Sequence, residues 1–364
     1  MRAAIRGLGI VGGFGSGIEK LKHTLISGKR TPKLIQLSIK KRTIEMPVYL
    51  CDTSPLGAFL NKRALRRVDH FSRLALLGSF LAMEDADMLQ ADHENFAIII
   101  ATGYGASNTT FSFLDTAFDD GDACASPTLF SNSVHNAAAA HVSILLKARG
   151  PNLTVSQFEM SVPSAMLAAC QWLEDRVADA VLLGGVDEYC SVLGYCWQRF
   201  FGADPPVSMK PVEWKTQSAI IGEGSAFFLL TRDEGDEPKY GFITDIQIGH
   251  VRKYKPQSPG DAFLFLGADG QKSSGIYYSR HIPHGARSAV YTPLYGSLPV
   301  GLAFDMAIGA LSVREDTVFA TPKHAGKDSG LNIFGKEQCL NSERISCLKF
   351  SCDGEFAMIT MAGT

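Results

Sequence analysis

Glu159 occupies the position of this chain that is best suited to covalent chemistry. The segment 150–171 has the sequence Gly-Pro-Asn-Leu-Thr-Val-Ser-Gln-Phe-Glu-Met-Ser-Val-Pro-Ser-Ala-Met-Leu-Ala-Ala-Cys-Gln. It predicts a β-branched strand, a sharp turn with Glu159 at its apex, and a buried helix that tolerates Pro163 only in its first turn. A thiol at such a turn is activated, because the helix N-terminus favours the thiolate. A carboxylate can exchange a proton there, but it holds an acyl group only as an unstable anhydride.

The cysteines do not suggest a metal site or another cofactor. Eight of them are spread along the chain: Cys51, Cys124, Cys170, Cys190, Cys196, Cys339, Cys347 and Cys352. There is no C-x-x-C pair and no histidine-rich companion cluster, so we predict neither a bound metal nor a cofactor. Cys170 lies in an apolar run, where a reduced thiol packs as a small hydrophobic side chain. We therefore expect a reducing, cytoplasmic environment.

Length and composition are those of an ordinary globular protein. The chain has 364 residues, 46% hydrophobic and 20% charged, and a net charge of -2. A net charge this small gives the protein no overall electrostatic attraction to nucleic acid or to an acidic membrane. The N-terminus is too glycine-rich for a signal peptide, and no window approaches eighteen apolar residues, so we expect neither export nor a membrane span. At roughly 150 residues per domain, two core-forming units are expected.

Glu159 must be positioned by the helices and strands around it. Short apolar runs alternate with helical patterns along the sequence, which predicts α/β layers. Strands are predicted over 96–101, 180–183, 225–230 and 356–361, and helices over 67–87, 134–148, 165–173 and 304–313. A polar, proline-containing stretch over 231–240 separates two sets of apolar runs. We therefore predict an N-terminal half over 1–235 and a C-terminal half over 236–364.

The segment around Glu159 resembles the active-site region of the β-ketoacyl synthases, members of the thiolase superfamily. Their run T-V-D-T-A-C-S-S precedes an alanine-rich helix ending A-C-Q, and gapless matching over 154–171 puts Glu159 where the family has its acyl-carrying cysteine. Further similarity covers 6–11, 69–76, 183–188 and 221–226, the last resembling the G-E-G-A signature. The resemblance implies an α/β thiolase fold, in which two similar halves stack in five αβαβα layers.

The second half departs further from the family pattern. The segment 266–271 is the nearest match to the A-H-G-T-G-T motif and puts Asp269 at the position of the first catalytic histidine. The segment 291–297 replaces the K-S-N-I-G-H motif, with Ser297 at the second histidine and Thr292 at the lysine, give or take one residue. The glycine-rich turn near the family's C-terminus is represented only by 349–354.

These replacements bear directly on the condensation reaction of the family. It needs a thiolate to hold the acyl chain and two imidazoles to assist decarboxylation and stabilise the enolate. Here the three positions carry Glu159, Asp269 and Ser297. An Asp269 that faces Glu159 would also add like-charge repulsion where an oxyanion must be stabilised. We therefore expect that this chain cannot carry out the condensation alone.

The sequence leaves the role of Glu159 open. It is either a carboxylate satisfied by the free N–H groups of a helix N-terminus, or a general acid/base whose pKa burial has raised, or a residue misaligned with the family cysteine. His135 is expected to serve in capping or packing. His281 and His284 could reach the vacated pocket from a loop.

A synthase-like chain without its catalytic groups resembles the chain length factors, silent subunits that pair with an active synthase and shape its acyl tunnel. In those subunits the cysteine position is often glutamine, so glutamate is a departure. The stretch 126–136 resembles short synthase-like proteins of the aryl polyene type. Bulky side chains would close the tunnel at the subunit interface; if they are not simply core, the candidates are Phe111, Phe113, Phe130, His135 and Phe158.

Three functional hypotheses follow. The first is a non-condensing partner subunit in fatty acid or polyketide (polyene-type) biosynthesis, which forms a heterodimer with an active β-ketoacyl synthase and recruits acyl carrier protein. The second is an enzyme of altered chemistry built around Glu159, such as a malonyl-carrier-protein decarboxylase or an acyl transferase. The third is a homodimeric acyl-binding protein with a self-complementary interface.

Overall fold

Strands from both halves of the chain meet in one large sheet. The computed structural model describes residues 2–39, 42–91, 93–201, 205–260, 262–323, 325–326 and 330–363. The strand order is β13-β11-β10-β15-β16-β9-β1-β8-β7-β5-β6, with the short β2 (Gly15–Ser16) paired to β1. The two halves of this sheet are joined where Ala3 and Ala4 of β1 pair with Ile243 and Phe242 of β9.

The N-terminal half-sheet contains the strand that leads to Glu159. Its strands are β1 (Ala3–Gly12), β8 (Gly224–Arg232), β7 (Ala180–Asp187), β5 (Phe96–Thr102) and β6 (Asn152–Ser156). Every residue of β5 and β7 is buried, as expected for central strands that are covered on both faces. β6 pairs with β5 in parallel register and forms one end of the sheet.

The C-terminal half-sheet contains the strands that carry the second and third family motifs. It consists of β9 (Phe242–His250), β16 (Glu355–Ala362), β15 (Ile345–Phe350), β10 (Phe263–Leu266), β11 (Arg287–Ala289) and β13 (Asn332–Ile333). β10 pairs in parallel with β11 and β15, so their carboxyl ends meet at one edge. Residues that follow these strands can therefore converge.

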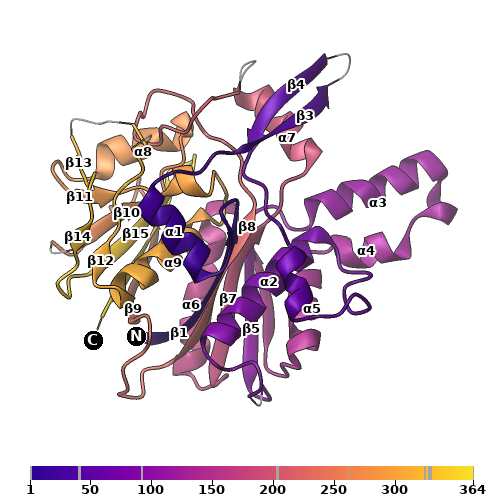
Figure 1. Ribbon diagram of the computed structural model, residues 1–364, viewed down its shortest axis with the longest axis horizontal. Coiled ribbons are helices and arrows are strands. Elements are labelled where there is room, and N and C mark those ends of the chain that lie inside the picture. Colours follow the sequence, from indigo (N-terminus) through magenta and orange to yellow (C-terminus); the bar gives the residue numbers. More distant parts are fainter. Residues whose placement is uncertain are drawn as a thin grey trace.

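The three largest hydrophobic clusters among the described residues lie between layers of helices and strands. α2 (His70–Asp85) and α5 (Ala137–Leu146) cover the outer face of the N-terminal half-sheet. α6 (Ser161–Glu174) and α9 (Gly301–Arg314) lie between the half-sheets, joined in the same core by α1 (Ile18–Ser27). α8 (Lys272–His281) packs on the outer face of the C-terminal half-sheet. The layers are therefore α, β, α, β and α (Figure 1).

Two helices extend away from these layers. α3 (Ser107–Asp120) and α4 (Pro127–Ser133) are linked by a short 3-10 turn, η2 (Asp122–Cys124), and form an arm at one side of the molecule (Figure 1). Ser126 caps α4, its Oγ accepting the N–H of Leu129 at 3.3 Å. The rings of Phe113 and Phe130, 5.4 Å apart, hold the two helices together.

A hairpin and a helix cover another part of the molecule. The hairpin consists of β3 (Lys33–Ile39) and β4 (Arg42–Val48), and α7 (Ser191–Phe201) lies against β3. The remaining short elements are η1 (Ser54–Ala58), η3 (Phe158–Met160), η4 (Thr292–Leu294), β12 (Thr317–Val318) and β14 (Gln338–Cys339).

The elements predicted from apolar periodicity are present, with shifted ends. The strand predicted over 180–183 continues as β7 to Asp187, and the helix predicted over 67–87 begins only at His70 as α2. The segment where the half boundary was predicted lies between β8 and β9. Among the described residues, no helix is long and apolar enough to cross a membrane.

Candidate functional site

The turn that carries Glu159 has the predicted form. β6 ends at Ser156, η3 spans Phe158–Met160, and α6 begins at Ser161. Phe158 has a φ of 45°, a left-handed conformation that is strained for a bulky side chain. Ser161 fixes the turn, because its Oγ accepts the N–H of Gln157 at 2.6 Å and donates to the carbonyl oxygen of Thr102 at 2.9 Å. The strained turn therefore places Glu159 just before the N-terminus of the buried helix α6.

Glu159 is half-buried at the apex of this turn. Burial raises its pKa, Lys349 counteracts that shift, and Asp269 adds to it through like-charge repulsion. Within the described part of the chain, no other side chain forms a hydrogen bond to the Glu159 carboxyl group. The environment therefore favours the neutral acid more than water does.

Asp269 and Ser297, the residues matched by resemblance to the family's two histidines, lie together in the structure. Both side chains are buried, and the Ser297 hydroxyl donates to Asp269 Oδ2 at 2.7 Å. Gln271 adds two donors, its side-chain amide at 3.1 Å from Oδ2 and its backbone N–H at 3.3 Å from Oδ1. Asp269 thus has partners on both carboxylate oxygens.

Lys349 supplies the charge that balances this carboxylate. Its Nζ lies 3.1 Å from Asp269 Oδ2 and 2.9 Å from the carbonyl oxygen of Gly267. Burial opposes the ionisation of Asp269, but the Lys349 ammonium and the Ser297 hydroxyl outweigh it and hold the pKa of Asp269 below its usual value. A Cβ at position 267 would lie 2.9 Å from Lys349 Cδ and 3.1 Å from Asp305 Oδ2, so a larger residue there would displace the lysine side chain.

A second buried acid lies beneath this ion pair. Asp305 of α9 is fully buried, and its Oδ1 accepts the hydroxyl of Tyr295 at 2.8 Å. Its Oδ2 has no hydrogen-bond partner among the described residues. Burial raises the pKa of Asp305 to about 7, against the opposing effects of Tyr295 and Lys349. One lysine therefore serves three acidic groups: Asp269, Asp305 and Glu159.

Thr292, matched to the family lysine, has a different role here. Its hydroxyl donates to the carbonyl oxygen of Ala268 at 2.6 Å, next to Asp269. The positive charge that the motif lacks comes instead from Lys349 on β15.

Aromatic side chains border Glu159 on one side. The Phe158 ring is 58% exposed and meets the Tyr104 ring edge-on, with centroids 5.9 Å apart. Tyr104 is hydrogen-bonded to the Trp197 side chain, and burial, Asp187 and Glu159 raise the pKa of its hydroxyl. These rings link the apex of the turn to α7.

The other interface candidates lie on or beside the arm. Phe111 and Phe113 are half-buried on α3, whereas Phe130 on α4 is 58% exposed. The exposed His135 packs its ring against the backbone of Gly105, which agrees with the predicted packing role. These residues are not part of the Asp269 network.

The two histidines expected in a loop have other surroundings, and His281 is not in a loop, because it is the last residue of α8. The His281 ring lies 5.9 Å from that of Phe350, and His284 is exposed. No contact described in the structure joins either residue to Glu159 or Asp269.

Lys349 was not predicted from the sequence to supply a positive charge at the site. A signal was present, because it is the single charged side chain in the otherwise uncharged, fully buried strand Ile-Ser-Cys-Leu-Lys-Phe. A lysine is almost never fully buried without a partner, so its place in this strand already indicated an acidic partner near the edge of the sheet. Tyr104 and Trp197 carried no comparable signal.

This arrangement restricts the chemistry that the site can perform. Both carboxylate oxygens of Asp269 already accept hydrogen bonds, so this group is a poor base. Glu159 is the acid that remains without a side-chain hydrogen bond. No group of three or more potential metal-ligating side chains occurs in the described ranges.

Sequence comparisons agree with the resemblance. The family model "Beta-ketoacyl synthase, N-terminal domain" matches residues 2–235. The 3-oxoacyl-[acyl-carrier-protein] synthase 2 of Synechocystis sp. is 24% identical over 201 residues, covering 53% of this chain and 48% of the relative. The chain thus spans about half the length of that curated relative.

Structural comparisons show the fold. The ishigamide ketosynthase/chain length factor superposes with a TM-score of 0.82 at 16% identity and covers 100% of this chain and 99% of that chain. A type II PKS acyl-carrier protein in complex with its ketosynthase gives 0.75 at 13% identity, with coverage of 100% and 99%. The predicted five-layered thiolase fold is therefore confirmed.

Proposed function

The chain belongs to the β-ketoacyl synthase family, and from that premise we propose that it is a chain-length-factor-like partner subunit. In this role it pairs with an active β-ketoacyl synthase, receives acyl carrier protein, and does not condense acyl chains by itself. The pathway class is fatty acid or polyketide biosynthesis of the polyene type. The chain works inside the cytoplasm, where the partner and carrier protein are made.

The closed network around Asp269 is the observation that carries this proposal. A condensing site needs a free base or hydrogen-bond donor beside a nucleophile. Here Ser297 and Lys349 both direct their donors at Asp269 Oδ2, at 2.7 and 3.1 Å. The groups at the histidine positions are therefore satisfied by one another. The nucleophile position holds Glu159, which cannot retain an acyl chain.

An open sheet edge supports the presence of a partner. β6 ends the sheet, and α5, α6 and the turn between β6 and α6 carry exposed apolar side chains, which we call the edge face with β6 itself: Ile144 72%, Phe158 58% and Leu167 46% exposed. Unpaired strand edges and clustered apolar groups are features that proteins usually cover. A synthase subunit with a similar edge would extend the sheet and cover these side chains.

Co-expression tests the proposal. The tagged chain is produced with β-ketoacyl synthase subunits from the same organism, and the complexes are separated by size-exclusion chromatography. We expect one synthase to co-elute, and Leu167→Arg on the edge face to abolish the complex. Ile248→Arg is the matched control, because Ile248 is 40% exposed on β9, away from this face. A stable homodimer that never exchanges with any synthase would defeat the proposal and favour the acyl-binding homodimer.

A specific observation favours one alternative, an enzyme built around Glu159. Its carboxyl group has a raised pKa and no hydrogen bond to another described side chain, so it can donate or accept a proton. Decarboxylation of malonyl-carrier protein or acyl transfer would use that proton. The test follows mass loss from malonyl- and acyl-carrier protein with the wild type and Glu159→Gln. Identical turnover by both proteins would exclude this role for the carboxyl group.

A further inference from the structure

Positive charge is concentrated in one short segment of the chain. Residues 29–42 contain six basic side chains and no acidic one: Lys29, Arg30, Lys33, Lys40, Lys41 and Arg42. This segment connects α1 to the β3–β4 hairpin, which projects from the body of the molecule beside α7 (Figure 1). The net charge of -2 gives the whole protein no attraction to an acidic surface, so this cluster of charge can act only locally.

The basic side chains at the base of the hairpin are exposed to solvent. Lys29, Arg30 and Lys33 all lie on the surface, and none of them forms an ion pair with an acidic side chain in the part of the chain that the structure describes. Arg199, in the last turn of α7, is exposed as well. These four cations are therefore available to an anionic partner.

Two acidic side chains lie near these cations. The hydrogen bonds that Asp52 accepts from Ser54 lower its pKa most, and the charge of Lys33 lowers it further. Glu45 of β4 accepts a hydrogen bond from Gln36 of β3 at 2.8 Å. Both carboxylates thus already have polar partners, and the cations outnumber them, so the surface keeps a net positive charge.

Bulky apolar side chains are exposed on the same elements. Leu34 of β3 is 66% exposed, Phe200 of α7 is 82% exposed, and Val207, in the segment between α7 and β8, is 96% exposed. Leu34 directly follows Lys33, and Phe200 directly follows Arg199. Water solvates such side chains poorly, so their exposure beside cations indicates a surface that is covered in use.

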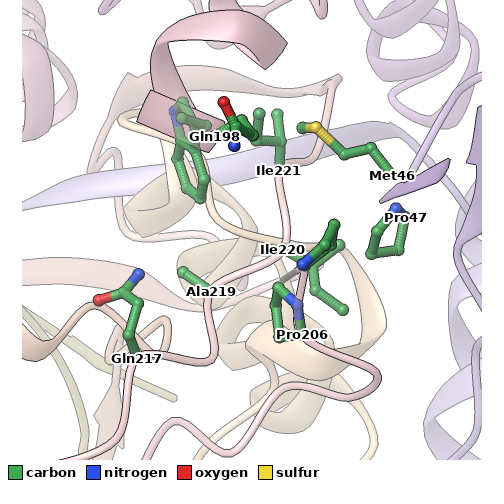
Figure 2. Close-up of a pocket in the computed structure, with 10 residues that line it drawn as sticks. Met46, Pro47, Gln198, Pro206, Gln217, Ala219, Ile220 and Ile221 are labelled. Atoms are coloured by element: carbon green, nitrogen blue, oxygen red, sulfur yellow. The ribbon is translucent and has the colours of Figure 1, made fainter. Parts of the chain in front are cut away.

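The elements that carry these side chains are packed together. Pro47 of β4, Gln198 of α7 and Pro206 lie in the walls of one small pocket of about 50 Å³ (Figure 2). Leu34 pairs with Pro47 across the hairpin, and the two other exposed apolar residues follow Gln198 and Pro206 within two positions. The pocket is too small for a ligand of its own, but it shows that the elements form one surface. We call it the hairpin surface, and it consists of Lys29, Arg30, Lys33, Leu34, Arg199, Phe200 and Val207.

Basic and bulky apolar groups on one surface favour a particular kind of partner. Lysine and arginine are attracted to the phosphates of an anionic lipid surface, and exposed apolar side chains enter the boundary between the headgroups and the acyl chains. A nucleic acid backbone would use the charges but leave Leu34 and Val207 in water. A lipid bilayer uses both kinds of group.

We propose that the hairpin surface docks this protein on an anionic lipid bilayer. The cations lie at the level of the lipid phosphates, and the apolar side chains of Leu34, Phe200 and Val207 enter the bilayer below them. The binding is reversible and weakens with salt, because it depends on a few charges and three side chains. The proposal does not rest on the proposed function, since the hairpin surface and the edge face are formed by different elements.

Vesicle co-sedimentation of the full-length chain tests the proposal. The vesicles are phosphatidylcholine with about 30% phosphatidylglycerol, compared with phosphatidylcholine alone. We expect the protein to bind the anionic vesicles and to bind the neutral vesicles much more weakly. Raising the salt concentration from about 0.1 M to about 0.5 M should weaken the binding, because salt screens the attraction.

Two triple variants test the position of the charges. Removal of three cations from the hairpin surface should weaken binding about a hundredfold, because each contributes about 1 kcal/mol near an anionic surface; the variant is Lys29→Gln/Arg30→Gln/Lys33→Gln. The matched control removes the same charge and should change binding less than about threefold; it is Lys147→Gln/Arg149→Gln/Arg176→Gln. The control residues precede β6 and β7, whereas the hairpin is bridged to the segment before β8, whose start pairs with the end of β7.

A tryptophan at position 207 tests insertion into the bilayer. Val207→Trp adds a fluorophore at an exposed position, and brominated phosphatidylglycerol should quench this added signal on binding. Val177→Trp is the control, because Val177 is exposed just before β7, and its signal should not be quenched. Phe200→Ser should weaken vesicle binding about tenfold, since it removes one inserted side chain.

Three results would overturn the proposal. The first is no binding of the wild type to anionic vesicles, including the case in which an oligonucleotide or an acidic protein binds the same cations instead. The second is equal weakening in the two triple variants, and the third is equal quenching at positions 207 and 177. The outcome is separable from that of the partner test, because Leu167→Arg should lose the synthase complex and still bind vesicles.

Discussion

Lys349 and Asp269, 80 residues apart in sequence, form an ion pair in which both side chains are 3% exposed. Each charge alone would be very unfavourable in such a buried place, because neither can be solvated by water. The pair joins the end of β10 to β15, and the Ser297 hydroxyl connects it to the turn before α9. The residue that the family resemblance matches to a catalytic histidine is thus part of a buried ion pair in this structure.

Removing the lysine should therefore destabilise the protein strongly. Lys349→Met leaves Asp269 buried without its counter-charge, and we expect the free energy of unfolding to fall by about 3–5 kcal/mol. Guanidinium unfolding measures it. In the control, Lys22→Met breaks the partly exposed pair with Glu315 and should cost about 0–1 kcal/mol. A double variant, Lys349→Met with Asp269→Asn, should lose less than the sum of the single changes. Equal effects of Lys349→Met and Lys22→Met would contradict this account.

Glu159 should make stability depend on pH. A carboxyl group with a raised pKa binds its proton more tightly in the folded state, so its contribution is present at low pH and is lost as pH rises through the folded pKa. Glu159→Gln imitates the neutral acid. We expect little difference between this variant and the wild type at pH 4, and a more stable variant at pH 8. Thermal unfolding at both values measures the effect, with exposed Glu19→Gln as the control. A variant less stable at pH 8 would exclude a raised pKa.

Glu188 should make the stability of the protein depend on pH in the same direction as Glu159, and more strongly. Its Oε1 accepts the N–H of Asn108 at 2.8 Å, its Oε2 has no partner within the described ranges, and burial raises its pKa to about 8. The free energy of unfolding should fall as pH rises from about 4 to about 8, between the unfolded and folded pKa values. Asp305, with a pKa raised to about 7, acts in the same direction. Glu188→Gln should flatten the decline in melting temperature over this interval. An unchanged slope would show that Glu188 is not the titrating group.

His93 should contribute to stability through two carbonyl groups. The side chain is buried, with Nδ1 2.7 Å from the carbonyl oxygen of Leu146 and Nε2 2.9 Å from that of Met88. Leu146 ends α5, and Met88 follows α2, so the ring ties two helix ends together. A neutral imidazole has one N–H and can donate to only one of these carbonyl oxygens, so His93→Leu removes one hydrogen bond and one ring contact and should cost about 1–3 kcal/mol, measured by urea unfolding. Exposed His23→Leu should change stability little. Equal losses in the two variants would rule out the tie.

The fold was predictable where local pattern and burial coincide. β5 is a run of uninterrupted apolar residues, and α6 is apolar on most of its surface, so both could be identified from the sequence. β7 was predicted too short because Gly184 and Gly185 usually interrupt a strand. In the structure, a Cβ at Gly184 would lie 2.3 Å from the Phe227 ring, so tertiary packing requires glycine there.

The candidate site was predictable only in part. Order along the chain and motif context singled out Asp269 and Ser297 through the resemblance, but the contact between their side chains is seen only in the structure. The motifs did not indicate what balances the carboxylate, because Lys349 comes from a strand far away in sequence.

The open edge of β6 has a consequence for the protein before it meets any other subunit. Its unpaired backbone groups can accept a strand from any chain, including a misfolded one. A cell that makes this protein in excess would therefore accumulate aggregates or lose the surplus to proteolysis. With the proposed partner subunit covering the edge, the amount that survives would follow the supply of that subunit.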